Sequence, residues 1–273
     1  MTSPDINQAR ARSFGAVAAD YDRLRPRYPD ALVDDVVAML PGRSVLEVGA
    51  GTGIATAAFA ARGMAMTCVE PDPDMAAVLA AKLAGNPELH LEVAKFQDWS
   101  ATRPAGAPRF DGLVSGQAWH WTDPQTRWAD AHAALREGGV LALFWNDENY
   151  VDPRVPEAFT AAYDRHGIEI RTVRPAPQDL DQNANDGSPD GWPPNHDEVA
   201  SEFFTAMRTH QYHRTLRVPV ADYVARINTS SAHLIMLREV RDDLTAELLA
   251  TLTGYGDDVL LEMTTDLATA IRR

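Results

Sequence analysis

The chain of 273 residues is 45% hydrophobic and 23% charged, a composition that fits a globular protein with a core and excludes a disordered or fibrous one. Its 39 acidic residues outnumber its 25 lysines and arginines, giving a formal charge of −14, and so we expect no nucleic-acid partner. We expect a soluble, cytoplasmic protein without a membrane partner, because there is one cysteine, no apolar signal segment at the amino terminus and no apolar run near the ~18 residues of a membrane-spanning helix.

Residues 1–40 are predicted to form a helical cap. Helices are expected at about 6–21 and 29–40, joined by an arginine-rich segment at 23–28. Pro26 disfavours helical backbone in the residue before it, so the first helix should end there. This part precedes the first strand and is expected to fold over the sheet.

Residues 41–146 alternate apolar strands with helices. The predicted strands are 45–48, 65–69, 89–94, 112–115 and 140–145, and the predicted helices are 54–61, 75–84 and 124–135. Asp74 is placed to cap the second of these helices. Such alternation predicts an α/β fold whose parallel sheet is covered on both faces, with its ligand crevice at the carboxyl ends of the strands.

The remaining residues have a different character. Residues 147–200 are predicted to be an insertion and a loop, of which 175–195 is rich in Pro, Asn, Asp and Gly and is expected at the surface near the site. From 201 to 273 regular structure resumes, with predicted strands at 207–214 and 259–265 and predicted helices at 220–237 and 244–252. We predict that 1–273 is a single domain.

A glycine-rich loop follows the first strand. Gly49, Gly51 and Gly53 carry no side chains, so the backbone and the next helix can come close to a ligand. A dinucleotide fingerprint requires its third glycine at 54, where the chain has Ile54, and this spacing weakens the interpretation as a nicotinamide dehydrogenase. The plain alternative is a tight turn between strand and helix.

Two carboxylates lie near this loop. Glu47 is inside an apolar strand, where burial of an unpaired carboxylate is costly, so a partner is expected. Glu70 ends the neighbouring strand, and one of the two can meet an amino group and the other a ribose diol. The alternative for Glu70 is a solvated charge at a strand end. Cys68 is most simply a small buried hydrophobe.

The loop sequence V-L-E-V-G-A-G-T-G at 45–53 resembles the first motif of class I S-adenosylmethionine-dependent methyltransferases. The later motifs of that superfamily are matched in order by V-E-P at 69–71, F-D-G-L-V-S at 110–115 and L-R-E-G-G-V-L at 135–141. The stretches Y-D-R-L-R-P-R-Y-P at 21–29 and S-G-Q-A-W-H-W at 115–121 are similar to the type 11 group, which includes trans-aconitate methyltransferases acting on small molecules.

This resemblance implies a doubly wound, mostly parallel, seven-stranded Rossmann-like sheet. It implies a methyltransferase that uses S-adenosylmethionine and methylates an oxygen or nitrogen of a small-molecule acceptor. By the same resemblance Glu47 reaches the cofactor ammonium directly or through water, and Glu70 takes the ribose hydroxyls. The full set of implied cofactor-binding residues is Tyr21, Glu47, Gly49, Gly51, Gly53, Glu70, Pro71, Phe96, Gln97 and Ser115.

One position departs from the family pattern. Many relatives place an acidic or hydroxyl residue near the adenine amine, but Lys95 cannot accept its proton, which leaves Gln97 or the backbone of Phe96. This departure keeps open a third hypothesis, a non-catalytic subunit that only binds the cofactor. Tyr21 is expected at the cofactor, although Arg25 beside it fits a solvated turn equally well.

His120 is the candidate catalytic residue, because it follows the fourth strand at the mouth of the sheet. Its imidazole can act as a base or orient the acceptor, and the competing interpretation is a packed core histidine. In an extended segment, Trp119 and Trp121 would point to the side opposite His120. We predict no metal site, because the carboxylates at 147 and 148 show no ligand spacing. The acceptor's identity and the oligomeric state do not follow from the sequence.

Overall fold

The computed structural model describes residues 17–104, 106–168 and 198–273, and the chain divides into two compact units. The described part of unit 1 comprises 17–25, 147–168 and 213–264. The described part of unit 2 comprises 26–104, 106–146, 198–212 and 265–273. Unit 2 contains the predicted core at 41–146, while the prediction of a single domain stays a prediction.

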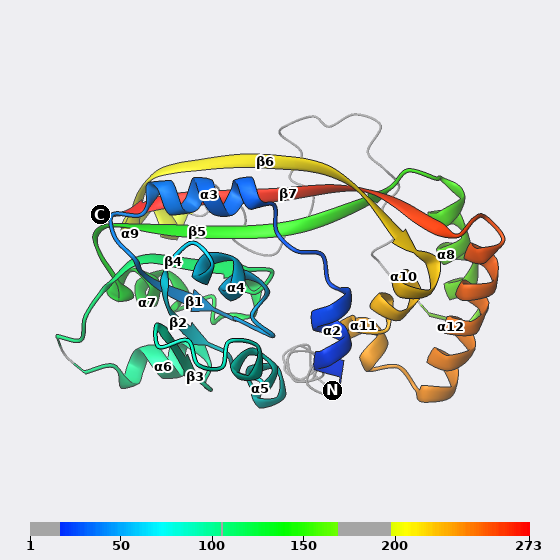
Figure 1. Ribbon diagram of the computed structural model, residues 1–273, viewed down its shortest axis with the longest axis horizontal. Helices are drawn as coiled ribbons and strands as arrows, with labels where there is room; N and C mark the ends of the chain where they lie inside the picture. The colour runs from blue at the N-terminus through cyan, green and yellow to red at the C-terminus, as the bar shows by residue number, and fades with distance from the viewer. Residues whose placement is uncertain (1–16, 105, 169–197) are drawn as a thin grey trace. The chain divides into compact units, whose positions relative to one another are not determined.

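A seven-stranded sheet has the order β3-β2-β1-β4-β5-β7-β6 (Figure 1). Its strands are β1 (Ser44–Val48), β2 (Ala65–Val69), β3 (Leu89–Glu92), β4 (Phe110–Gly116), β5 (Leu135–Tyr150), β6 (Phe204–Pro219) and β7 (Asp258–Arg272). The first five pair in parallel, and β7 runs antiparallel. The Rossmann-like, mostly parallel sheet predicted from the sequence is therefore confirmed. β1 and β4 are neighbours in the middle of this sheet, at the point where the strand order reverses, and in open parallel sheets ligands bind outside the carboxyl ends of the strands at such a point.

Helices cover both faces of the sheet in unit 2, because the central strands are apolar on both sides. One core packs against α3 (Asp30–Met39), α4 (Ile54–Ala60) and α5 (Pro73–Lys82), with Phe59 and Leu79 among its fully buried side chains. The other packs against α6 (Phe96–Thr102), α7 (Arg127–Ala134) and α9 (Glu198–Phe203), around Trp119 and Trp128.

Unit 1 has a separate apolar core. Its helices are α2 (Ala18–Leu24), α8 (Arg154–Arg165), α10 (Val220–Ile227), α11 (Ser231–Leu234) and α12 (Arg238–Thr253) (Figure 1). Phe159, Tyr223 and Leu248 are buried in this core, on α8, α10 and α12 respectively. In the part of the chain that the structure describes, none of the helices combines the length and apolarity needed to cross a membrane.

Several sequence predictions were wrong in detail. The helix predicted over 220–237 is two helices, because Thr229 Oγ1 donates to the carbonyl of Arg226 (2.7 Å) and Ser230 begins a new helix. The cap of α5 is Asp72, which accepts from the amides of Asp74 and Met75, and not Asp74. Helices α6 and α8 were not predicted, and the predicted loop at 175–195 lies outside the described residues.

Candidate functional site

The glycine loop joins β1 to α4, and its three glycines meet different surroundings. All three have positive φ, at 71° for Gly49, 54° for Gly51 and 80° for Gly53. A Cβ on Gly49 would lie 2.3 Å from the Cβ of Ala118, and one on Gly53 would lie 2.3 Å from Cδ1 of Leu79. On Gly51 the nearest atom would be the sulfur of Met75 at 3.9 Å. Packing explains the first and third glycines, and only Gly51 leaves room for a ligand.

Glu70 lies just past the carboxyl end of β2 and is hydrogen-bonded to the glycine loop. Its carboxylate accepts hydrogen bonds from the amide of Gly51 (2.7 Å) and from the amide of Asp72 (2.8 Å). Burial raises the pKa of Glu70 to about 7, against the opposing effect of these two amides. The acidic group expected at the tip of this strand is thus fixed beside the one open glycine.

Glu47 is buried on β1 beneath the loop. Its carboxylate accepts from Thr56 Oγ1 (2.6 Å) in α4, and Cys68 Sγ lies 4.0 Å away. Burial raises the pKa of Glu47 to about 8. The partner that burial required is therefore Thr56, which sequence reasoning did not single out. Cys68 is fully buried, and burial raises the pKa of its thiol, so it resembles a small core residue.

Beyond β4 the chain turns at once instead of continuing extended. Residues Trp119–Trp121 form a 3₁₀ helix, with the amide of Trp121 donating to the carbonyl of Ala118 (2.9 Å) and Thr122 Oγ1 donating to that of Trp119 (2.6 Å). The expectation of an extended segment was wrong, because these turn bonds replace the strand ladder. As a result Trp119 is buried at 1% exposure, whereas Trp121 is 38% exposed.

His120 lies in this turn among aromatic rings. Its imidazole centroid is 4.6 Å from the ring of Trp121 and 5.9 Å from that of Trp145. Nδ1 is buried and has no hydrogen-bond partner in the structure. Burial and, second, the positive charge of Arg127 lower the pKa of His120 to about 4. The imidazole is therefore neutral near pH 7 and has one nitrogen available to a ligand.

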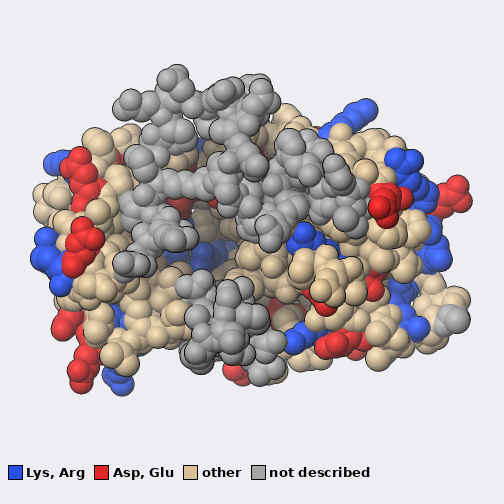
Figure 2. Space-filling view, turned by 180° about the vertical axis from the view of Figure 1, so that it is seen from behind, with Lys and Arg blue, Asp and Glu red and all other residues tan. Residues whose placement is uncertain are grey.

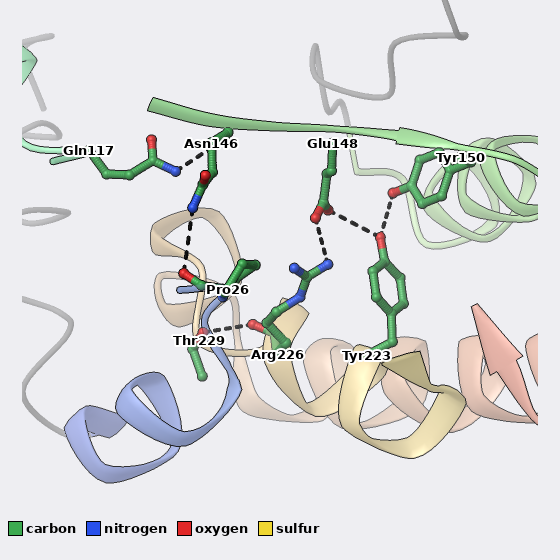
Figure 3. A network of polar contacts seen from close by, with 8 residues as sticks. All are labelled: Pro26, Gln117, Asn146, Glu148, Tyr150, Tyr223, Arg226 and Thr229. Carbon is green, nitrogen blue, oxygen red and sulfur yellow. Dashed lines mark hydrogen bonds and ion pairs between the residues drawn. The ribbon is translucent and has the colours of Figure 1, made fainter. Parts of the chain in front are cut away.

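Polar contacts tie the ends of β4 and β5 together. The side-chain amide of Gln117 donates to the carbonyl of Asn146 (3.1 Å), and Asn146 Nδ2 reaches the carbonyl of Pro26 at 3.5 Å (Figure 3). Asn146 Oδ1 accepts from Thr265 Oγ1 at 2.6 Å. Ser115 is fully buried, and its hydroxyl donates to the carbonyl of Val48 (2.9 Å). These contacts link β4 to β1, and the segment after β4, Pro26 and β7 to β5, and the cofactor contact of Ser115 stays a prediction.

The expected adenine-side residues begin α6. Phe96 is buried and stacks on Trp99, with ring centroids 6.1 Å apart, whereas Gln97 is half-buried. Lys95 precedes the helix as its N-cap residue and makes no side-chain cap hydrogen bond. Pro71 is exposed after Glu70. Their cofactor contacts stay predictions.

Tyr21 lies in unit 1, on α2, while the glycine loop belongs to unit 2. The guanidinium carbon of Arg25 lies 4.7 Å from the centre of the Tyr21 ring, and Arg25 also donates to the carbonyl of Thr229 (3.4 Å). The predicted helix end is close to the observed one, since α2 ends at Leu24. The contact of Tyr21 with the cofactor stays a prediction.

A polar cluster around the buried side chains of Tyr223 and Arg226 in unit 1 was missed by sequence reasoning (Figure 3). Arg226 on α10 pairs with Glu148 at 2.6 Å, although the arginine side chain is 7% exposed. The hydroxyl of Tyr223 donates to Glu148 (3.4 Å) and lies 2.6 Å from that of Tyr150, whose pKa burial raises to about 12. The available signal was an arginine in an apolar helix, since a buried cation requires a partner.

Charge on the surface is mixed. On the face shown in Figure 2, Lys and Arg side chains lie among Asp and Glu, and no continuous basic patch is seen over the described residues. Within the described ranges, no group of three or more His, Cys, Asp or Glu residues is arranged to hold a metal ion.

Residues 46–141, which contain the glycine loop, Glu70 and His120, match the family model described as a methyltransferase domain. An uncharacterized methyltransferase of Bacillus velezensis is 38% identical over 168 residues, covering 59% of this chain and 71% of its own. A probable S-adenosylmethionine-dependent methyltransferase of Saccharomyces cerevisiae is 28% identical over 54% of this chain and 50% of its own. The chain spans about half the length of the mycobacterial relatives that it matches.

A solved structure supports the fold. The putative type II methyltransferase from Anaeromyxobacter dehalogenans superposes with a TM-score of 0.59 over 90% of this chain and 97% of its own. At 20% identity this likeness shows the fold alone. The sheet order, the glycine loop with its acidic neighbour and the Bacillus relative lead to one assignment: the chain belongs to the S-adenosylmethionine-dependent methyltransferase family.

Proposed function

We propose that this chain transfers a methyl group from S-adenosylmethionine to a small molecule. The observation that carries the proposal is the bond between the Glu70 carboxylate and the Gly51 amide, at the one glycine of this loop where an added Cβ would meet no atom closer than 3.9 Å. A nucleoside has a diol from which a strand-end carboxylate can accept hydrogen bonds, and S-adenosylmethionine and NAD share this feature. The dehydrogenase alternative loses support because Ile54 stands where the dinucleotide fingerprint requires its third glycine.

The residues present fit this cofactor. Glu70 would accept from the ribose hydroxyls, Gly51 would let the backbone approach the methionine portion, and Glu47 would face its ammonium through Thr56 or a water molecule. Pro71, Phe96 and Gln97 would line the adenine side. When bound, the cofactor supplies an activated methyl group on a sulfonium, and the protein mainly aligns the acceptor and excludes water.

His120 is the proposed acceptor-side residue. Its neutral imidazole can accept a hydrogen bond from an acceptor hydroxyl and hold the oxygen in line with the methyl group. With a pKa near 4 the imidazole is a weak base, so we favour an orienting role over prior deprotonation of the acceptor. We expect that His120→Gln lowers turnover at least tenfold, because a flexible amide does not hold the acceptor oxygen in line as a fixed imidazole does. Cofactor affinity should stay within about twofold, because His120 is not among the proposed cofactor contacts.

The finer assignment is to the type 11 group, with enzymes resembling trans-aconitate methyltransferase. It rests on the segments at 21–29 and 115–121. Under this proposal Tyr21 contacts the cofactor, and Ser115 acts by holding β4 on β1.

Calorimetry with S-adenosylhomocysteine tests the cofactor site. Wild-type protein is expected to bind it with micromolar Kd, and Glu70→Ala is expected to weaken binding by about 10- to 100-fold, the scale for losing a partner of buried polar groups. Glu92→Ala is the matched control, because Glu92 also ends a strand of the sheet but is exposed. Preferential binding of NAD, or equal affinity in the Glu70 variant, would overturn the site.

Turnover separates an enzyme from a silent binding subunit. The protein is incubated with methyl-labelled S-adenosylmethionine and a metabolite extract, and labelled small molecules are separated from protein. Labelled product that disappears in the Glu70→Ala variant supports the enzyme. Tight cofactor binding without any labelled product in the wild-type reaction would instead favour the non-catalytic alternative.

A further inference from the structure

The environment of His120 restricts the kind of acceptor that fits, given the proposed function. Trp121 is among the large hydrophobic side chains that stay exposed, at 38%, and its ring lies 4.6 Å from the imidazole with the planes at 44°. The ring of Trp145 lies 5.9 Å from the same imidazole. An exposed indole next to a candidate catalytic group offers a flat apolar face, and planar rings pack well on such faces.

The orphaned nitrogen of His120 calls for a particular partner. Nδ1 is buried without a hydrogen bond, whereas buried polar groups in native structures are nearly always paired. With the proton on Nε2, Nδ1 is an acceptor, so the missing partner is a donor such as a hydroxyl. The indole Nε1 of neighbouring Trp119 is a donor, but it too is buried without a hydrogen-bond partner, so it is not the group that satisfies His120 Nδ1.

The positive charge of Arg127 near His120 favours a methyl acceptor that reacts through oxygen over one that reacts through nitrogen. Arg127 is buried at the start of α7, and its positive charge acts on His120. A guanidinium in this position stabilises an oxygen that gains negative charge as its proton leaves. By the same physics it disfavours a protonated amine, which would bring a second cation into a partly dry site.

We infer that the acceptor is a phenol-type compound, a planar aromatic ring carrying a hydroxyl, which stacks against Trp121 and donates to Nδ1 of His120. In the reaction the bond between the methyl carbon and the sulfonium sulfur breaks, with its electron pair left on sulfur, and a bond forms between that carbon and the phenolic oxygen. The hydroxyl proton is lost to water as the new bond forms, while His120 holds the hydroxyl through the hydrogen bond to Nδ1. The products are an aryl methyl ether and S-adenosylhomocysteine.

The test uses the full chain saturated with S-adenosylhomocysteine and measures binding of matched small molecules by calorimetry. The probes are phenol, catechol and 2-naphthol, with cyclohexane-1,2-diol as the saturated hydroxyl control and benzylamine as the cationic aromatic control. At least one phenol is expected to bind ten times or more tightly than both controls. Equal binding of the saturated diol, tighter binding of benzylamine, or no binding of any phenol overturns the inference.

Two substitutions of the same side chain localise the effect. Trp121→Ala is expected to reduce affinity for the best phenol at least tenfold, whereas Trp121→Phe, which keeps an aromatic face, should stay within about threefold of wild type. Unchanged binding in Trp121→Ala removes the proposed stacking surface and overturns the inference.

Failure at the two levels can be told apart. If S-adenosylhomocysteine does not bind to the wild-type chain, the proposed function fails and the acceptor inference fails with it. If S-adenosylhomocysteine binds normally and the phenols show no preference, only the acceptor inference fails. The affinity of both Trp121 variants for S-adenosylhomocysteine serves as the folding control and is expected to match the wild-type value.

Discussion

Two buried carboxylates under the glycine loop give the ligand-free protein an unusual dependence on pH. The pKa of Glu47 is raised from 4.5 to about 8 and that of Glu70 from 4.5 to about 7, in both cases chiefly by burial. At a pH between the ordinary and the raised pKa of each carboxyl group, the folded state keeps the proton bound whereas the unfolded state has released it. The pKa values of His120 and His233 are lowered from 6.5 to about 4, chiefly by burial, so these histidines oppose the carboxylates below pH 6.5. The free energy of unfolding should therefore fall as pH rises from about 6.5 to 8.

This prediction is checked by thermal unfolding across that pH range in the absence of cofactor. The decrease is expected to be on the order of 1–3 kcal/mol, and Glu47→Gln, which cannot ionise, should flatten the profile. Binding of S-adenosylmethionine should oppose the trend, because its positive groups favour the ionised carboxylates. A stability that rises from pH 6.5 to 8 in the ligand-free wild-type protein would contradict the assignment of raised pKa values to the two carboxyl groups.

Substitutions in the glycine loop should separate packing from ligand approach. Gly53→Ala forces a Cβ to within 2.3 Å of Leu79 and keeps a φ of 80°, so we expect a loss of stability of about 2 kcal/mol or more. Gly51→Ala meets no close atom and should lose only about 1 kcal/mol from its positive φ, while its affinity for S-adenosylhomocysteine falls at least tenfold. Denaturant unfolding and calorimetry measure the two quantities. If Gly51→Ala and Gly53→Ala were equally stable and lost the same affinity for S-adenosylhomocysteine, the separate roles of the two glycines would be contradicted.

At the scale of single elements, the beginning of α5 offers a matched pair of variants. Asp72→Ala removes the side chain that accepts from the amides of Asp74 and Met75 and should lower stability by about 1 kcal/mol. Asp74→Ala removes an exposed carboxylate in the first turn and should change stability by less than about 0.5 kcal/mol. Chemical denaturation distinguishes them, and a larger effect at Asp74 would contradict the observed cap.

The strand contact of Ser115 gives a second element-scale prediction. Its hydroxyl joins β4 to the last carbonyl of β1, so Ser115→Ala is expected to cost about 1–2 kcal/mol of stability. Affinity for S-adenosylhomocysteine should fall by less than about threefold once the variant is fully folded. A large loss of affinity at unchanged stability would return Ser115 to the direct cofactor contacts.

Strands and helices of the parallel core were predictable because burial on both faces leaves a strong apolar signal, as at β1 and β2. Helix α8 carried a helical signal of its own, with buried positions at 155, 158, 159, 162 and 163, but Pro153 and Pro156 beside its start obscured it. Proline is tolerated there because the first turn of a helix has unpaired amides. The polar residues after Trp145 concealed the rest of β5, since the strand continues to Tyr150 with half-exposed side chains.

The candidate site was only partly predictable for a different reason. Glycines and acidic residues at strand ends form a local pattern, so Gly51 and Glu70 could be found in the sequence. The partner of Glu47 is nine residues away and depends on how α4 packs on β1, which no local pattern reports. The turn at His120 likewise depends on backbone bonds formed after β4 ends.

For the whole molecule, the discontinuous path of the chain determines what can fold alone. The described part of unit 2 combines 26–104 and 106–146 with 198–212 and 265–273, and Ala200, Phe204 and Ala270 complete one of its cores. A fragment of 26–146 would end on β5 without its neighbour β7, leaving an apolar edge strand unpaired. We expect this fragment to aggregate in size-exclusion chromatography. A permuted chain that appends 198–212 and 265–273 should be monomeric, and a monomeric, cooperatively unfolding 26–146 would contradict this view.

Because the three loop glycines have different surroundings, selection is expected to retain them for different reasons. A descendant that lost its cofactor would be released from the demand at Gly51, yet Gly49 and Gly53 would still be retained, because Ala118 and Leu79 fill the space where their side chains would be. A homologue that has lost its activity would therefore still keep most residues of the glycine-loop motif. The residues at positions 51 and 70 together should therefore distinguish active homologues from inactive ones better than the whole glycine-loop motif does.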